Sequence, residues 1–191
     1  MDDVLYSFAF RGLLTDQTLD STPRLRRRPN DNLDPEVVKR LPVDVLDEDL
    51  VFRARRMAVI YVAIASFENT VREFVSKRLL ESLGADWWNQ GVSEKIRTKA
   101  ESRREEESKI KWHTPRGEQQ INYTEFGDLS SIINQNWQHF EAYLHSQEWA
   151  RQIIITLERS RNVIMHSGEL GVEDIERIGT SIRDWIRQVG T

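Results

Sequence analysis

Apolar side chains recur at intervals of three and four residues along most of the chain, which is the spacing of one face of an α-helix. The longest such run extends from Val45 to Leu83, and no proline interrupts it. A straight helix of that length would measure about 60 Å, so we expect it to bend, to split near Glu48 or to project into a partner. Its apolar positions are Leu46, Leu50, Met57, Ile60, Ile64, Val71, Phe74 and Leu79.

The pattern changes after Gly84, which is expected to end this long helix. A highly charged helix is predicted from about Ser93 to Ile110, where opposite charges three and four residues apart are typical of a solvated face. An exposed loop over residues 113–122 follows. It leads into a helix that contains Ile132 and Ile133, and a further helical stretch is predicted over about 136–143.

The two clearest helices come last. One is predicted from about Glu148 to Met165, with Ser167 and Gly168 as its stop, and the other from Val172 to Val189. The alternation of a strand persists nowhere, so the pattern predicts an all-α fold, a helical bundle. Their apolar stripes are Trp149, Ile153, Leu157 and Ile164 in the first helix and Ile175, Ile178, Ile182, Trp185 and Ile186 in the second.

Residues 1–43 are less regular, because four prolines and several polar residues interrupt them. We therefore predict an irregular N-terminal arm over 1–43 and a helical domain over 44–191. The densest basic patch lies in the arm and either contacts nucleic-acid phosphates or belongs to a solvated segment. It consists of Arg24, Arg26, Arg27 and Arg28.

The composition narrows the class of protein. A chain of 191 residues without cysteine fits one domain with or without an arm, and it has neither a disulfide framework nor a thiolate metal site. No apolar run could span a bilayer, and Met1-Asp2-Asp3 lacks the basic start of a secretory signal, so we expect a cytoplasmic protein with no membrane partner. A net charge of −4 means that nucleic acid must be bound by local basic patches.

Most enzyme signatures are absent from the sequence. We find no glycine-rich phosphate loop, no Gly-x-Ser-x-Gly elbow and no HExxH motif. No two of the histidines have the i, i+4 spacing that places two imidazoles on one helix face, so we expect no metal and no cofactor. The four histidines are His113, His139, His145 and His166.

The most informative segment runs from Arg159 to Gly168, at the end of the helix that begins near Glu148. At about 100° per residue, Arg161 falls near the line of Leu157, so its guanidinium should point toward the core side or an interface. His166 lies about 140° away around the same helix. The two side chains diverge on a straight helix, and they could converge by unwinding near Gly168 or across a two-fold dimer.

Two interpretations of this segment remain open from spacing alone. His166 could be an ordinary residue of a helix C-terminus, with Arg161 in an ion pair at the edge of the core, to Glu68 or to Asp128. Alternatively, an arginine and a histidine so placed could supply phosphate binding and proton transfer.

The segment Arg161-Asn162-x-x-x-His166 resembles the motif of the HEPN superfamily, an arginine often followed by a polar residue with a histidine four to six positions on. In that superfamily the motif lies late in a compact helical bundle, as it does here. The preceding run over 123–140 looks like the branch at the C-terminus of a transcript-surveillance endoribonuclease. The resemblance covers roughly residues 45–190.

This resemblance implies a HEPN-like bundle and a metal-independent endoribonuclease that works as a homodimer, with the Arg and His of both subunits in one composite cleft. His166 would act in acid–base catalysis, Arg161 would hold the scissile phosphate, and Asn162 would orient the phosphate or the imidazole. We assign Arg159 and Glu68 to substrate binding, Glu68 through a pair with Arg161. The setting would be defence, toxin or RNA surveillance, with an inhibitory or activating protein partner.

Two other classes are weighed against this one. A non-catalytic HEPN dimer would serve as an RNA- or protein-binding module. A DNA-binding regulator would need a basic recognition helix, and the helix over 93–111 mixes its charges too evenly for that role. Three tryptophans near loops are candidates for an interface or for base stacking, namely Trp87, Trp88 and Trp112.

Overall fold

The computed structural model describes residues 35–190, which fall into two units that divide between Asp47 and Glu48. The first unit contains α2 (Pro35–Arg40) and the 3-10 helix η1 (Val43–Val45). Most of the predicted arm, including its basic patch, lies outside the described residues. Within 35–190 every regular element is helical, which confirms the all-α prediction.

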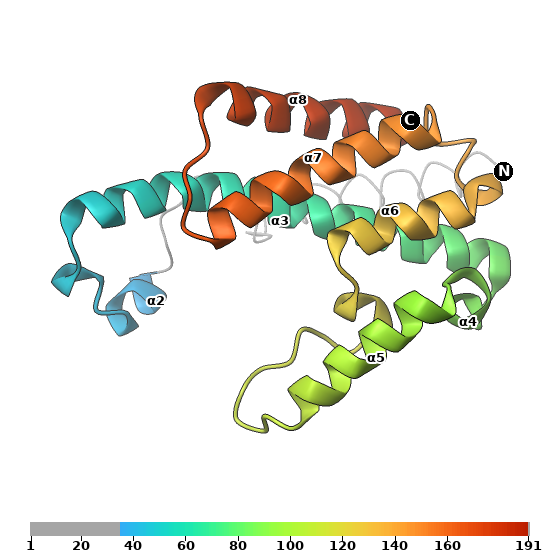
Figure 1. Ribbon diagram of the computed structural model, residues 1–191, viewed down its shortest axis with the longest axis horizontal. Helices are drawn as coiled ribbons and strands as arrows, with labels where there is room; N and C mark the ends of the chain where they lie inside the picture. Colours follow the sequence, from blue (N-terminus) through green and yellow to red (C-terminus); the bar gives the residue numbers. More distant parts are fainter. Residues whose placement is uncertain (1–34, 191) are drawn as a thin grey trace, which may run out of the picture. The chain divides into compact units, whose positions relative to one another are not determined.

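Helix α3 (Glu48–Leu83) is the element on which the second unit is built, and it is a single helix of 36 residues. It packs against α6 (Phe126–Gln135), α7 (Gln147–Met165) and α8 (Val172–Val189), as Figure 1 shows. Gly84 follows with φ 74°, a left-handed conformation that glycine adopts without strain. The buried positions of α3 are spaced three or four apart: Met57, Ile60, Ile64, Phe67, Val71, Val75 and Leu79.

Trp185 of α8 lies at the centre of this core and is fully buried. Its ring meets Phe67 of α3 edge-on at 5.5 Å and stacks on Trp149 of α7 at 5.7 Å. Aromatic pairs in these arrangements add to the free energy gained by burying their area. The predicted limits of α8 are confirmed, and those of α7 differ by one residue.

The remaining elements form a connection between α3 and α6. It contains α4 (Trp87–Gly91), α5 (Glu94–Ser108) and the 3-10 helix η2 (Gln120–Tyr123). Helix α5 packs mainly on η2, and its Arg103 donates to the Tyr123 carbonyl at 2.8 Å. Charged as it is, α5 buries only Ile96 and Ala100. The prediction of a largely solvated helix is therefore confirmed.

Three expectations about local structure are wrong. The stretch over 136–143 is only the short 3-10 helix η3 (Trp137–His139) with turns, because the Asn136 side chain ends α6 by donating to the Gly91 carbonyl at 2.6 Å and to the Ile132 carbonyl at 2.8 Å. Leu46 and Leu50 are exposed instead of continuing the apolar stripe of α3. Trp88 is buried in the core rather than available at the surface.

None of the described helices combines the length and the apolar character that a membrane crossing requires.

The packing of α3 makes a paired prediction. Val71→Ala removes two methyl groups from a side chain that is fully buried, so it should lower the free energy of unfolding by about 2 kcal/mol. Val62→Ala is the same change on the exposed side of the same helix and should alter stability by less than about 0.5 kcal/mol. Urea denaturation measures both, and equal losses would contradict this core.

Candidate functional site

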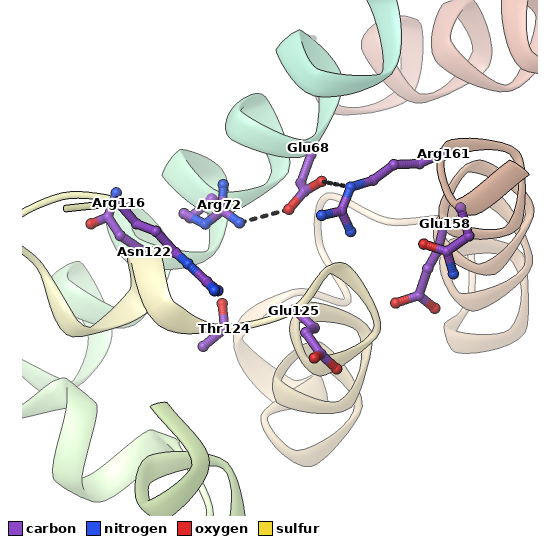
Figure 2. Close-up of a pocket in the computed structure, with 9 residues that line it drawn as sticks. Glu68, Arg72, Arg116, Asn122, Thr124, Glu125, Glu158 and Arg161 are labelled. Atoms are coloured by element: carbon purple, nitrogen blue, oxygen red, sulfur yellow. Dashed lines mark hydrogen bonds and ion pairs between the residues drawn. The ribbon is translucent and has the colours of Figure 1, made fainter. Parts of the chain in front are cut away.

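Glu68 on α3 lies between two arginines and bonds to both (Figure 2). One carboxylate oxygen accepts from the Arg72 guanidinium at 2.8 Å, and the other lies 3.6 Å from Nε of Arg161 on α7. The Glu68 side chain is only 13% exposed and that of Arg161 is 30% exposed. A carboxylate so placed neutralises a cation at the edge of the core.

This geometry answers one of the questions left open by the sequence. Arg161 reaches the core side of α7 as predicted, and its partner is Glu68. The alternative partner, Asp128, is engaged elsewhere, because it accepts from the Glu125 backbone N–H at 3.0 Å and pairs with Arg103 at 3.6 Å. The predicted pair between Arg161 and Glu68 is therefore confirmed.

Arg72 is held in place by more than Glu68. Its guanidinium also donates to the Asn69 side chain at 2.6 Å and to the Ile121 carbonyl at 3.2 Å. Ile121 belongs to η2, so Arg72 ties α3 to the connection that precedes α6. Three partners leave this arginine with a fixed orientation.

A pocket of about 700 Å³ opens beside these ion pairs. Glu158, Arg161 and Asn162 line it from α7, Glu68 and Arg72 line it from α3, and residues between 116 and 125 supply the rest. Figure 2 shows how most of these side chains lie. Three of its lining residues are arginines and three are glutamates, so their formal charges cancel. An anion would therefore have to compete with the carboxylates for the guanidinium groups. The remaining lining residues are Arg116, Asn122, Thr124 and Glu125.

Glu158 is a lining residue that the sequence analysis missed. It precedes Asn162 by one helical turn, and one carboxylate oxygen accepts from the Gly127 backbone N–H in the first turn of α6 at 2.9 Å. A negative charge at a helix N-terminus is stabilising. A Cβ at position 127 would lie 3.0 Å from both carboxylate oxygens, which explains the glycine there. The i−4 spacing from Asn162 was the available signal.

His166 is placed differently from its motif partners. It is the C-terminal cap of α7, it is exposed, and it is not among the residues that line the pocket in the described chain. Because α7 remains helical through Met165, unwinding near Gly168 does not bring His166 toward Arg161. Arg159 is also exposed and outside the pocket lining. One of the two routes to convergence that the sequence suggested is therefore absent from this structure.

The turn after His166 is tightly constrained. The Ser167 N–H donates to the Ile164 carbonyl at 2.9 Å and the Gly168 N–H to the Val163 carbonyl at 2.8 Å, which together form a Schellman motif. Ser167 takes the left-handed conformation, with φ 60°, that glycine usually occupies in this motif. Since both bonds close directly over the helix end, they fix the position of His166.

The chain belongs to the Swt1-like HEPN family. The bundle and the late helix that carries an arginine and a histidine define the class as a HEPN domain, and the model of the Swt1-like HEPN family matches residues 63–190. The resemblance stated above is thereby confirmed. Comparisons with curated proteins and with solved structures gave no match. Membership of this superfamily is consistent with a role in RNA cleavage or RNA binding.

The helix end supplies a second stability prediction. A Cβ on Gly168 would lie 2.8 Å from Cγ1 and 2.9 Å from the carbonyl oxygen of Val163, so Gly168→Ala should cost about 1 to 3 kcal/mol of stability. Ser167→Gly should leave stability unchanged or raise it by up to about 1 kcal/mol, because it relieves a left-handed serine. Thermal denaturation of both variants checks this, and an unaffected Gly168→Ala protein would refute the turn.

Proposed function

We propose that this protein is a metal-independent endoribonuclease that acts as a homodimer, with Arg161, Asn162 and His166 as its catalytic residues. The observation that supports the proposal is that the residues of the motif do not lie together in one chain. Arg161 and Asn162 line a polar pocket, whereas His166 stands exposed at the end of the same helix. A site that needs all three groups must therefore draw on two copies of the chain.

The surroundings of His166 favour such a second copy. Val163 and Met165, which lie near it on α7, are exposed apolar side chains, and so is Val172 at the start of α8. Apolar groups gathered around a polar residue are typical of a surface that another protein covers. In a two-fold dimer the same surface is used by both subunits, so two His166 side chains would approach two Arg161 pockets.

The chemistry follows from these groups. Arg161 binds a non-bridging oxygen of the scissile phosphate, with Arg72 and Arg116 lining the same pocket. His166 takes the proton of the adjacent 2′-hydroxyl as O2′ attacks phosphorus, and the imidazolium so formed gives a proton to the departing 5′-oxygen. The products are a 2′,3′-cyclic phosphate and a 5′-hydroxyl. DNA has no 2′-hydroxyl and is not cut.

The proposal gives Glu68, Asn162 and Arg159 supporting roles. Glu68 orients Arg161 toward the pocket through their ion pair, and Asn162 offers an amide to the phosphate or to the imidazole. Arg159 is exposed on α7 and contacts the RNA backbone outside the pocket. The biological setting we propose is defence, toxin action or RNA surveillance, in the cytoplasm, under the control of a protein partner.

One observation supports a second function, a non-catalytic HEPN dimer that binds RNA or protein. The cations of the pocket are already matched by carboxylates, with Arg161 and Arg72 on Glu68 and Arg116 on Glu107. A purely structural network would look the same. The two functions differ in whether substitution of an exposed histidine has any effect on RNA.

The direct test is incubation of total RNA and tRNA with wild-type and His166→Ala protein in excess EDTA. Folding and dimerisation are first compared by circular dichroism and light scattering. We expect cleavage by the wild type alone, with cyclic phosphate ends, because general acid–base catalysis contributes about 10²- to 10⁴-fold. Equal cleavage by both proteins would refute the assignment of His166, and cleavage by neither would favour the binding module.

Glu68→Gln supplies a further prediction. The amide oxygen can still accept from Arg72, but the amide NH2 cannot accept from Arg161, and the negative charge that competes with phosphate is removed. We expect KM to fall because the pocket becomes more positive, and kcat to fall because Arg161 is held less firmly. Glu141→Gln, at an exposed glutamate outside the pocket lining, is the matched control. Unchanged KM and kcat in Glu68→Gln would indicate that Arg161 takes no part in the reaction.

A further inference from the structure

A second groove adjoins the pocket around Arg161. Its volume is about 1000 Å³, and Arg72 and Asn122 line both hollows. One wall is the face of α3 from Asn69 to Leu80, the opposite wall is formed by Arg104 of α5 and residues 118–122, and Trp87 of α4 also lines it. An extended ligand with one group at Arg161 would pass Arg72 and enter this groove.

The groove also contains neutral polar groups that can recognise nucleotide bases. The exposed amides of Gln119 and Gln120 line one side. Asn69 and Ser76, which also bond to Arg72, line it from α3. Amide and hydroxyl groups both donate and accept hydrogen bonds, which suits the edges of unpaired bases. This lining differs from that of the Arg161 pocket, where charged groups dominate.

Trp87 offers the groove an aromatic surface. It is only partly buried, and it meets Trp88 edge-on, with the rings 5.6 Å apart and at 90° to each other. The two rings are therefore not stacked face to face, and the part of Trp87 that is not packed against the core faces the groove. Leu80, which is 51% exposed, lines the same groove. A flat ring beside an exposed apolar side chain is suited to stacking an unpaired base.

Positive and negative side chains nearly balance in the groove, so electrostatic attraction alone would not hold a nucleic acid there. Lys77 and Arg104 are exposed, and neither forms an ion pair within residues 35–190, so both can meet phosphates. Glu73 and Glu118 also line the groove and offset them. Since the net charge is small, stacking and base contacts must supply much of the affinity. Stacking on Trp87 requires a base free of a duplex, which points to single strands.

We propose that this groove binds the single-stranded RNA segment next to the phosphate at Arg161, with one base stacked on Trp87 and the backbone beside Lys77 and Arg104. The proposal rests on the proposed function only in placing the scissile phosphate at Arg161. It assigns α4, α5 and η2, which connect α3 to α6, to substrate binding.

The test measures binding of a fluorescein-labelled single-stranded oligoribonucleotide to full-length His166→Ala protein by fluorescence anisotropy. Trp87→Leu keeps an apolar side chain but removes the ring, and should weaken binding about 5- to 100-fold. Trp87→Phe should recover much of the loss. Arg104→Gln should weaken binding and reduce the slope of log Kd against log salt by about 0.7. Lys99→Gln, at an exposed position of α5 outside the groove, should bind as the parent does.

The same variants in the wild-type background separate this inference from the proposed function. Circular dichroism first establishes that each variant is folded. If RNA is cleaved and the groove variants bind and cleave like the wild type, the inference is wrong and the nuclease stands. If no RNA is cleaved but binding falls in Trp87→Leu and Arg104→Gln, the groove is confirmed and the nuclease is not. If the parent binds no oligoribonucleotide, the inference is overturned.

Discussion

The carboxylate of Glu68 is the group on which the arrangement of the site depends. It takes one arginine on each oxygen, and those arginines belong to different parts of the bundle, Arg72 to α3 itself and Arg161 to α7. Through Arg72 and the Ile121 carbonyl the same network reaches η2. One partly buried charge therefore connects the helix that carries the motif, the central helix and the segment that precedes α6. Removing a partner from such a network leaves a poorly solvated charge, which is strongly unfavourable.

This network also explains why the site is polar yet not strongly basic. The net charge of the protein is −4, and three arginines line the pocket. Each forms an ion pair, Arg72 and Arg161 with Glu68 and Arg116 with Glu107. An RNA phosphate has to exchange with Glu68 for the Arg161 guanidinium, so binding there is a competition between two anions. Such a site gains selectivity from what lies beside it, and the neutral amides, Trp87 and the apolar Leu80 lie in the adjoining groove.

Much of the fold follows from the sequence because helical periodicity is a local property. The limits of α8, the stop at Gly84 and the core-facing position of Arg161 all follow from spacing and from helix-ending residues. The failures arise where distant contacts override local pattern. Asn136 ends α6 because its side chain reaches the Gly91 carbonyl, 45 residues away in sequence. Likewise Arg116 joins the site through a loop and Asn122 through η2, and no spacing rule predicts such meetings. Glu158, which contacts the first turn of α6, was signalled only by its spacing from Asn162.

In the proposed nuclease, Arg161 and His166 act together only across two subunits, because Arg161 lines the pocket whereas His166 is exposed at the end of α7. The most direct test is to co-refold inactive Arg161→Ala and inactive His166→Ala proteins and assay RNA cleavage. A mixed dimer contains one site with Arg161 from one chain and His166 from the other. We therefore predict that cleavage returns on mixing, while each parent alone stays inactive. Native mass spectrometry verifies that mixed dimers have formed. If they remain as inactive as their parents, Arg161 and His166 do not form a site across two subunits.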